Sequence, residues 1–133
     1  MIQKKRTAAI IFNDQRAILM VMWKWHEELR TPWWTIEEWE SELECLAREL
    51  QEETWLILSD ATFVQKFEWP SAYTPNTTVH NFVYLCDVRG TITIDNEIAA
   101  YIRLDKDSYK TKKYKHVPAD IQVFDYLLAN NIR

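Results

Sequence analysis

The chain has 133 residues, of which 47% are hydrophobic and 27% are charged, and this length suits one domain over residues 1–133 with a core of its own. The formal net charge is −4, which argues against a nucleic-acid backbone or an anionic membrane as the main partner.

Two short apolar runs near the N-terminus, 7–12 and 17–22, predict a β-hairpin because Asn13-Asp14-Gln15-Arg16 between them is a turn signal. Residues 23–32 are polar and predict a loop. Arg30 in this loop is a candidate contact for a phosphate or a base, and the alternative is an ordinary surface arginine.

A single amphipathic helix is predicted to follow, beginning at Ser41. Ser41 and Glu44, three residues later, form a capping-box pattern. Apolar residues then recur at the three-and-four spacing of one helix face, which we expect to be buried. These residues are Leu43, Leu46, Ala47 and Leu50.

On another face of the same helix, Glu49, Glu52 and Glu53 lie at positions i, i+3 and i+4, so their carboxylates converge within one turn. Three like charges so close repel one another, and a hard divalent cation with oxygen ligands would offset the repulsion. A solvated acidic helix face is the alternative interpretation.

The segments after the helix predict further strands. Residues 56–58 and 61–68 suggest one strand, and the breaker-rich residues 69–76 predict a loop long enough to overhang a cleft. The run 79–88 is nearly continuous in β-branched and aromatic residues, which is typical of a central strand buried on both faces.

The last third of the chain predicts a turn at Arg89-Gly90, a short strand over 101–104 and a basic connection over 106–116. Pro118 then opens a C-terminal helix. We expect its inward face to carry Ile121, Phe124, Leu127 and Leu128. Strands, helix, strands and helix in this order suit a mixed sheet between helices.

The spacing of charged residues around the first helix forms an extended motif. From Trp34 the chain runs five residues to Glu40 and seven more to Arg48, and then reads Glu-Leu-Gln-Glu-Glu-Thr-Trp-Leu to Leu56. This resembles the Nudix box, which reads Gly, five residues, Glu, seven residues, Arg-Glu-apolar-any-Glu-Glu-any-Gly-apolar. Every acidic, basic and apolar position matches, whereas tryptophan stands at both glycine positions, Trp34 and Trp55.

The resemblance implies a Nudix-type α/β/α sandwich with a mixed β-sheet between helices. It also implies a Mg²⁺-dependent hydrolase, with Mn²⁺ as an alternative ion, that cleaves a nucleoside diphosphate linked to another moiety. On the matching positions, Glu49, Glu52 and Glu53 resemble metal ligands, and Glu52 or Glu53 the base for the attacking water. Arg48 resembles the arginine that orients these glutamates, and Glu40 its structural partner.

Three further residues enter through the resemblance. The backbone carbonyl of Trp33 falls where the family supplies a metal ligand. Glu97 resembles a distal acidic residue that completes metal or water binding, and an exposed loop glutamate is the alternative. Tyr73 lies about where some dinucleoside-polyphosphate hydrolases carry a substrate-binding tyrosine, although tyrosine is also common in such loops. The expected partner is a small-molecule nucleotide, bound by a monomer or a homodimer.

The glycine content is abnormal, because the chain has 1 Gly and 7 Trp, whereas average usage gives about nine glycines. We hypothesise systematic replacement of Gly by Trp, either from a codon that the source organism reads as glycine or by engineering. Trp33 and Trp34 would then place indoles in the loop expected to approach the phosphates, and Trp55 would take the left-handed position after the helix. We therefore expect impaired activity. The alternative function is an inactive Nudix-fold domain that binds nucleotides or proteins.

The two cysteines, Cys45 and Cys86, have no CxxC spacing, which favours core thiols in a reducing compartment. The apolar run near the N-terminus is too short for a signal peptide or a membrane span. We therefore expect a cytoplasmic protein.

Overall fold

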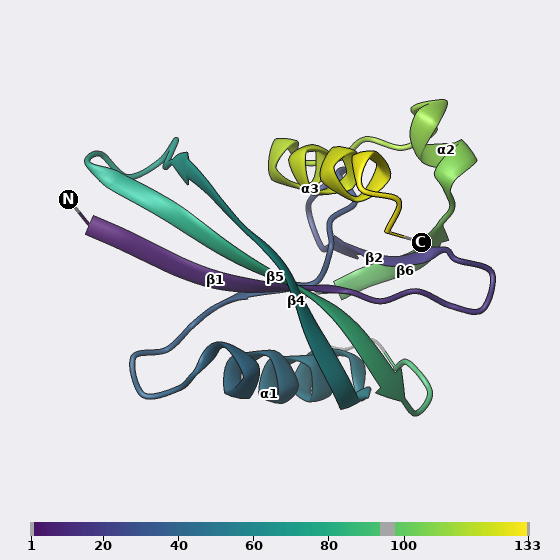
Figure 1. The fold of residues 1–133 in the computed structure, drawn as a ribbon, viewed down its shortest axis with the longest axis horizontal. Helices are drawn as coiled ribbons and strands as arrows, with labels where there is room; N and C mark the ends of the chain where they lie inside the picture. The colour runs from purple at the N-terminus through teal and green to yellow at the C-terminus, as the bar shows by residue number, and fades with distance from the viewer. Residues whose placement is uncertain (1, 94–97, 133) are drawn as a thin grey trace.

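The computed structural model describes residues 2–93 and 98–132 and has a mixed α/β architecture (Figure 1). A four-stranded mixed sheet has the order β3-β1-β5-β4, and a two-stranded antiparallel sheet pairs β2 with β6. The strands are β1 (Ile2–Ile10), β2 (Ile18–Trp23), β3 (Trp33–Thr35), β4 (Ile57–Pro70), β5 (Thr77–Arg89) and β6 (Ile98–Leu104). The helices are α1 (Glu42–Thr54), α2 (Lys106–Lys110) and α3 (Pro118–Ala129).

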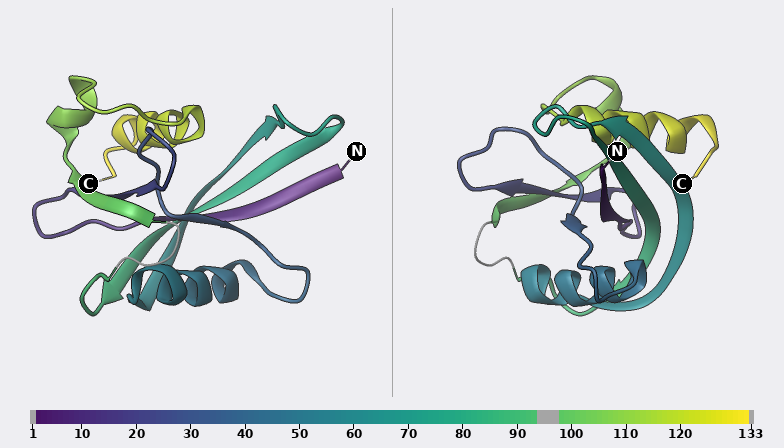
Figure 2. Two further views of the ribbon diagram at one scale, coloured as in Figure 1. Left: turned by 180° about the vertical axis from the view of Figure 1, so that it is seen from behind. Right: turned by 90° about the vertical axis from the view of Figure 1, so that its left-hand side faces the viewer.

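The sheets lie between two helical layers, with α1 on one side and α3 on the other (Figure 2). Side chains alternate along β1, so Ala8 and Ile10 join the core under α3, while Ala9 and Ile11 join the core under α1. The expected sandwich with a mixed sheet between helices is therefore confirmed. In the described part of the chain, no helix is long and apolar enough to cross a membrane.

The central strand is the one that the sequence predicts. β5 lies between β1, to which it is parallel, and β4, to which it is antiparallel. Its side chains from Thr77 to Cys86 are buried or half-buried. The two predicted fragments after α1 are one long strand, β4, which carries irregularities at 58–60 and 63–65 and extends through Trp69 and Pro70. The following loop is therefore shorter than predicted.

The predicted N-terminal hairpin is only partly correct. The turn at Asn13 is present, because its side-chain Oδ1 accepts hydrogen bonds from the backbone N–H groups of Gln15 and Ala17. Pairing between the two strands is limited to a bridge between Phe12 and Ile18. Beyond it, β1 pairs with β3 and β5, whereas β2 pairs with β6, because each strand finds a longer partner elsewhere.

Two predicted helix faces need correction. Leu46 and Leu50 of α1 are fully buried, Ala47 is half-buried and Leu43 is exposed. In α3, Phe124 and Leu127 are buried, Leu128 is half-buried and Ile121 is exposed. Each helix buries a narrower stripe than its apolar residues suggest, and Cys45 of α1 and Val123 of α3 complete the two stripes.

Candidate functional site

Both ends of α1 are set by local interactions. At its start, the Ser41 hydroxyl accepts a hydrogen bond from the Glu44 backbone N–H at 3.2 Å, and the Glu44 carboxylate accepts one from the Ser41 N–H at 2.9 Å. The predicted capping box is therefore confirmed. At its end, Trp55 has φ 65° and ψ 7°, the predicted left-handed conformation, and its N–H donates to the Gln51 carbonyl.

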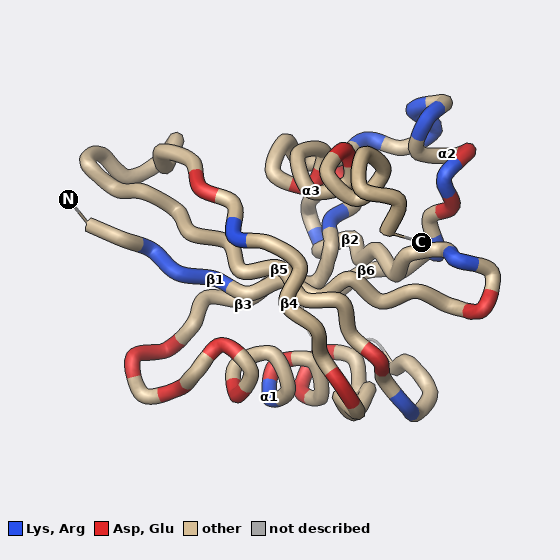
Figure 3. The backbone as a smooth tube through the Cα atoms, viewed as in Figure 1, with Lys and Arg blue, Asp and Glu red and all other residues tan. Residues whose placement is uncertain are grey.

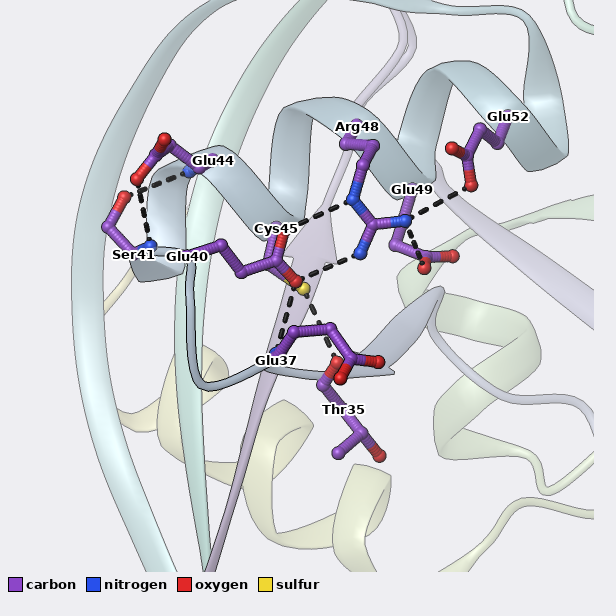
Figure 4. A network of polar contacts seen from close by, with 9 residues as sticks. All are labelled: Thr35, Glu37, Glu40, Ser41, Glu44, Cys45, Arg48, Glu49 and Glu52. Atoms are coloured by element: carbon purple, nitrogen blue, oxygen red, sulfur yellow. Dashed lines mark hydrogen bonds and ion pairs between the residues drawn. The ribbon is translucent and has the colours of Figure 1, made fainter.

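Arg48 is the centre of a polar network beside α1 (Figure 4). Its Nε donates to Oε2 of Glu40 at 3.1 Å and its Nη2 donates to Oε1 of Glu40 at 2.9 Å. Its remaining amino group, Nη1, donates to Glu49 at 2.8 Å and to Glu52 at 3.2 Å. One guanidinium thus connects the loop before α1 with two carboxylates on α1 itself.

Glu40 is buried at the base of this network. One of its carboxylate oxygens also accepts a hydrogen bond from the backbone N–H of Glu37 at 3.1 Å. The hydrogen bonds from Arg48 lower the pKa of Glu40 to about 2, and the same contacts raise the pKa of Arg48. The pair is therefore ionised throughout the physiological range and holds the loop against α1.

The three glutamates predicted as metal ligands share one stretch of α1. Glu49 and Glu53 are half-buried and Glu52 is exposed. Arg48 holds Glu49 and Glu52, and among the residues 2–93 and 98–132 no three His, Cys, Asp or Glu side chains form a group ready to hold a metal ion. The three glutamates are thus neighbours on the helix, but among the described residues their carboxylates are not arranged as a metal-binding group.

The donor chemistry nevertheless fits a hard divalent cation. The three side chains offer only carboxylate oxygens, they come from one rigid helix, and the Glu49 and Glu52 side chains remain accessible to solvent. To hold an ion, Glu49 and Glu52 would have to exchange their contacts with Arg48 for contacts with the ion.

A cleft of about 570 Å³ lies on the α3 side of the four-stranded sheet. Both residues predicted to bind substrate line it. Tyr73, 97% exposed, lies on the loop between β4 and β5, and Arg30 lies on the loop between β2 and β3. The cleft is also lined by the start of α3, including Val117 and Pro118.

Stacked indoles and guanidiniums occupy the side of this cleft. The Arg30 guanidinium lies 4.5 Å from the centroid of the Trp23 ring, and the centroids of Trp23 and Trp33 are 5.4 Å apart. The Arg6 guanidinium lies 4.1 Å from the Trp33 ring and 4.8 Å from the Trp69 ring. We call these five residues the indole–guanidinium stack. Both guanidiniums are within cation–π distance of their rings.

The two adjacent indoles at the start of the box, Trp33 and Trp34, do not lie as expected. Trp33 and Trp34 belong to strand β3 and not to a loop. Trp34 is buried in the core under α1, whereas Trp33 joins the stack at the cleft. The two side chains point to opposite faces because consecutive residues alternate along a strand. The Trp33 carbonyl therefore belongs to an edge strand of the sheet.

A buried carboxylate near the cleft was missed by sequence reasoning. Asp120, in the first turn of α3, is 1% exposed and accepts hydrogen bonds from the Thr31 backbone N–H at 2.9 Å and from the Thr31 hydroxyl at 2.8 Å. Burial raises its pKa to about 6, against the lowering influence of Thr31, Arg6 and Arg30. In the sequence it reads as an ordinary acidic residue at a helix start, so no local signal reveals it.

Arg6 was missed for a similar reason. It follows Lys4 and Lys5 in the sequence, and such a basic stretch is usually exposed to solvent. Figure 3 shows this basic stretch near the start of β1. Glu97, the predicted distal acidic residue, lies outside the described residues.

Comparisons with known proteins agree with this geometry. The NUDIX domain family model matches residues 3–127. The chain is similar to the E. coli ORF135 protein, with 22% identity and a TM-score of 0.81 over 99% of this chain and 93% of that chain. It is also similar to a NUDIX hydrolase from Nitrosomonas europaea, with 21% identity and a TM-score of 0.78 over 96% and 90% of the two chains.

A third similar structure comes from work on MutT of Aliivibrio salmonicida and Vibrio cholerae, with 19% identity and a TM-score of 0.79 over 96% of this chain and 98% of that chain. No curated protein matches the chain. At these identities the solved structures support the fold, while the family model spans nearly the whole chain and includes the network around Arg48. The protein is therefore a member of the Nudix family.

Proposed function

We propose that the protein is a Mg²⁺-dependent hydrolase of a nucleoside diphosphate linked to another moiety. The observation that carries this proposal is the Arg48 network. One guanidinium donates hydrogen bonds to Glu40 in the loop and to Glu49 and Glu52 on α1. A helix face that served only solubility would not require a buried partner for its arginine.

The residues have separate roles in this proposal. Glu49, Glu52 and Glu53 would hold Mg²⁺, with Mn²⁺ as the alternative ion, and the Trp33 carbonyl and Glu97 are the further proposed ligands. When bound, the ion neutralises phosphate charge and lowers the pKa of a water molecule.

The other roles fall to side chains of the chain itself. Arg48 orients the carboxylates of Glu49 and Glu52, and Glu52 or Glu53 accepts the proton of the attacking water. The part of the substrate remote from the cleaved bond would lie in the cleft on the α3 side, near Tyr73 and Arg30. Strand β3 joins the two regions, because Trp33 lines the cleft and the Thr35 carbonyl accepts a hydrogen bond from Cys45 of α1.

The test is the release of phosphorylated product from a panel of nucleotides, with Mg²⁺ and with EDTA. Glu52→Gln and Glu53→Gln should each reduce turnover by roughly a hundredfold or more, which is the usual contribution of a general base. Glu38→Gln, an exposed glutamate in the loop before α1, removes the same charge outside the network and should retain activity. Equal activity in all variants would refute the assignment of these carboxylates.

The second candidate function is a Nudix-fold domain that binds nucleotides or proteins without turnover. It is favoured by the tryptophans at the two glycine positions of the box, because Trp34 fills the core under α1 and Trp55 holds a left-handed conformation that suits glycine. The same assay on a variant with all seven tryptophans changed to glycine separates the two. Activity only in that variant would assign hydrolysis to a glycine-containing parent. Activity in neither protein, with the variant shown to be folded by circular dichroism, would favour the binding domain.

A further inference from the structure

Arg6 is a buried cation whose hydrogen-bonding capacity is unused. Its side chain lines the cleft, the residue is 9% exposed, and its Nε is buried without a hydrogen-bond partner. Among the described residues its guanidinium makes no hydrogen bond or ion pair, and its close contacts are the rings of Trp33 and Trp69. Since a buried charge is normally both paired and hydrogen-bonded, this arrangement calls for an acceptor.

Arg30 repeats the pattern at the same cleft. Its Nε is also buried without a partner, and its guanidinium stacks on Trp23. Stacking contacts the flat face of a guanidinium and leaves the donors in its plane, which match the oxygen pairs of phosphates and carboxylates. The indole–guanidinium stack therefore orients the N–H donors of two guanidinium groups, and the described residues provide no hydrogen-bond acceptor for either Nε.

The position of Arg6 shows which part of a substrate it would meet. Arg6 has the same strand parity as Ala8 and Ile10, whose side chains pack under α3. The carboxylates of Glu49 and Glu52 project from α1, which covers the opposite face of the sheet (Figure 2). A group bound by Arg6 is thus separate from the phosphates held against α1.

The charge balance of the cleft favours an anion over a neutral base. Lys4, Arg6 and Arg30 line it against a single carboxylate, Glu28, although the whole chain carries a net charge of −4. Asp120 lies close enough to both arginines to influence them electrostatically, but its hydrogen bonds go to Thr31. A neutral base would leave the three cationic side chains with only Glu28 in the cleft and the Asp120 carboxylate beside it.

We propose that Arg6 and Arg30 form an oxyanion subsite that binds a phosphate or carboxylate on the part of the substrate remote from the cleaved bond. This inference rests on the proposed function for its link to a substrate, and it narrows the substrate class to nucleotide derivatives whose second moiety is itself anionic.

The test is a titration followed by the Nε–Hε NMR signals of arginine side chains, in the absence of divalent metal. Inorganic phosphate and acetate are the two probes, and sodium chloride keeps the ionic strength constant. We expect saturable shifts of the Arg6 and Arg30 signals with one or both probes, and the stronger probe identifies the preferred anion. Arg6→Gln should weaken binding about tenfold or more, as expected for loss of a charged hydrogen-bonding partner.

Arg89→Gln is the matched control, because Arg89 is exposed at the end of β5 and does not line the cleft. It should bind the probes like the unmodified protein. Arg6→Lys keeps the charge but removes the planar fork, and it should bind more weakly than Arg6. If neither probe shifts the two signals, or if guanosine shifts them and the anions do not, the oxyanion subsite is refuted.

This experiment is independent of turnover. Anion binding without hydrolysis of any nucleotide would refute the proposed function and retain the subsite. Hydrolysis that depends on Glu52 and Glu53, without anion binding in the cleft, would retain the proposed function and refute the subsite.

Discussion

The Arg48 guanidinium holds the Glu40 carboxylate through two parallel hydrogen bonds, Nε to Oε2 at 3.1 Å and Nη2 to Oε1 at 2.9 Å, across eight residues of sequence. Because Glu40 precedes α1 and Arg48 lies in its middle, this pair fixes the loop against the helix. It also leaves Nη1 of Arg48 to contact Glu49 and Glu52.

The first prediction concerns the acid stability that this pair provides. The folded pKa of Glu40 is lowered from 4.5 to about 2, so its contribution is present above pH 4.5 and is lost as the pH falls toward 2. We expect Glu40→Gln to lower the free energy of unfolding by about 2 kcal/mol at pH 7, since it leaves a partly buried arginine without its main partner. Urea denaturation between pH 2 and pH 7 measures the difference. It should shrink below pH 4.5, and a difference that is the same at pH 3 and pH 7 would contradict the assignment.

The second prediction concerns Asp120, whose contribution to stability depends on pH in the opposite direction to that of Glu40. Burial raises the folded pKa of Asp120 from 3.8 to about 6, so the native state binds a proton more tightly than the unfolded chain between these values. The contribution of Asp120 to stability therefore falls as the pH rises from about 4 to 6.

Asp120→Asn removes this titration and retains groups that can hydrogen-bond to Thr31. Relative to the unmodified protein, we expect the variant to gain roughly 2 kcal/mol of unfolding free energy between pH 4 and pH 7. Thermal or urea denaturation of both proteins across this range provides the measurement. Asp125→Asn, an exposed residue on the same helix, serves as the control and should show no such gain.

The third prediction concerns the left-handed residues. Trp55 has φ 65° and is 59% exposed, and Trp25 has φ 70° and is 99% exposed. Replacing either by glycine should stabilise the protein by about 1 kcal/mol, because a residue with a Cβ is strained in this conformation. Trp39, 72% exposed, is not among the residues with positive φ, so Trp39→Gly should give no gain. Equal effects at all three positions, read from urea midpoints, would show that backbone conformation does not decide the outcome.

The fourth prediction is that Trp34 behaves in the opposite way to Trp55, although both stand at glycine positions of the Nudix box. Trp34 is 5% exposed and packs with Leu46 and Leu50 in the core under α1. Trp34→Gly should destabilise this chain by about 3 kcal/mol, because it removes a large buried side chain. A stabilised Trp34→Gly protein in the same urea experiment would mean that the core closes around the smaller residue.

Much of the candidate site can be predicted from the sequence because its determinants are local. Ser41 and Glu44 set the start of α1, and the left-handed Trp55 ends it, through contacts within one turn. Helical spacing alone places Arg48 within reach of Glu52, four residues later. The same short-range logic identifies β5 as a central strand from its apolar run.

The tertiary structure decided which distant residues meet. Strand β1 prefers β3 and β5 over its sequence neighbour β2, and this choice depends on the length of pairing available and on burial across the whole sheet. Thr31 and Asp120 are 89 residues apart, yet they form two buried hydrogen bonds. Arg6 meets Trp69 only because β5 and β4 pack beside β1. Sequence periodicity describes one element at a time, whereas the cleft is formed by contacts among several elements.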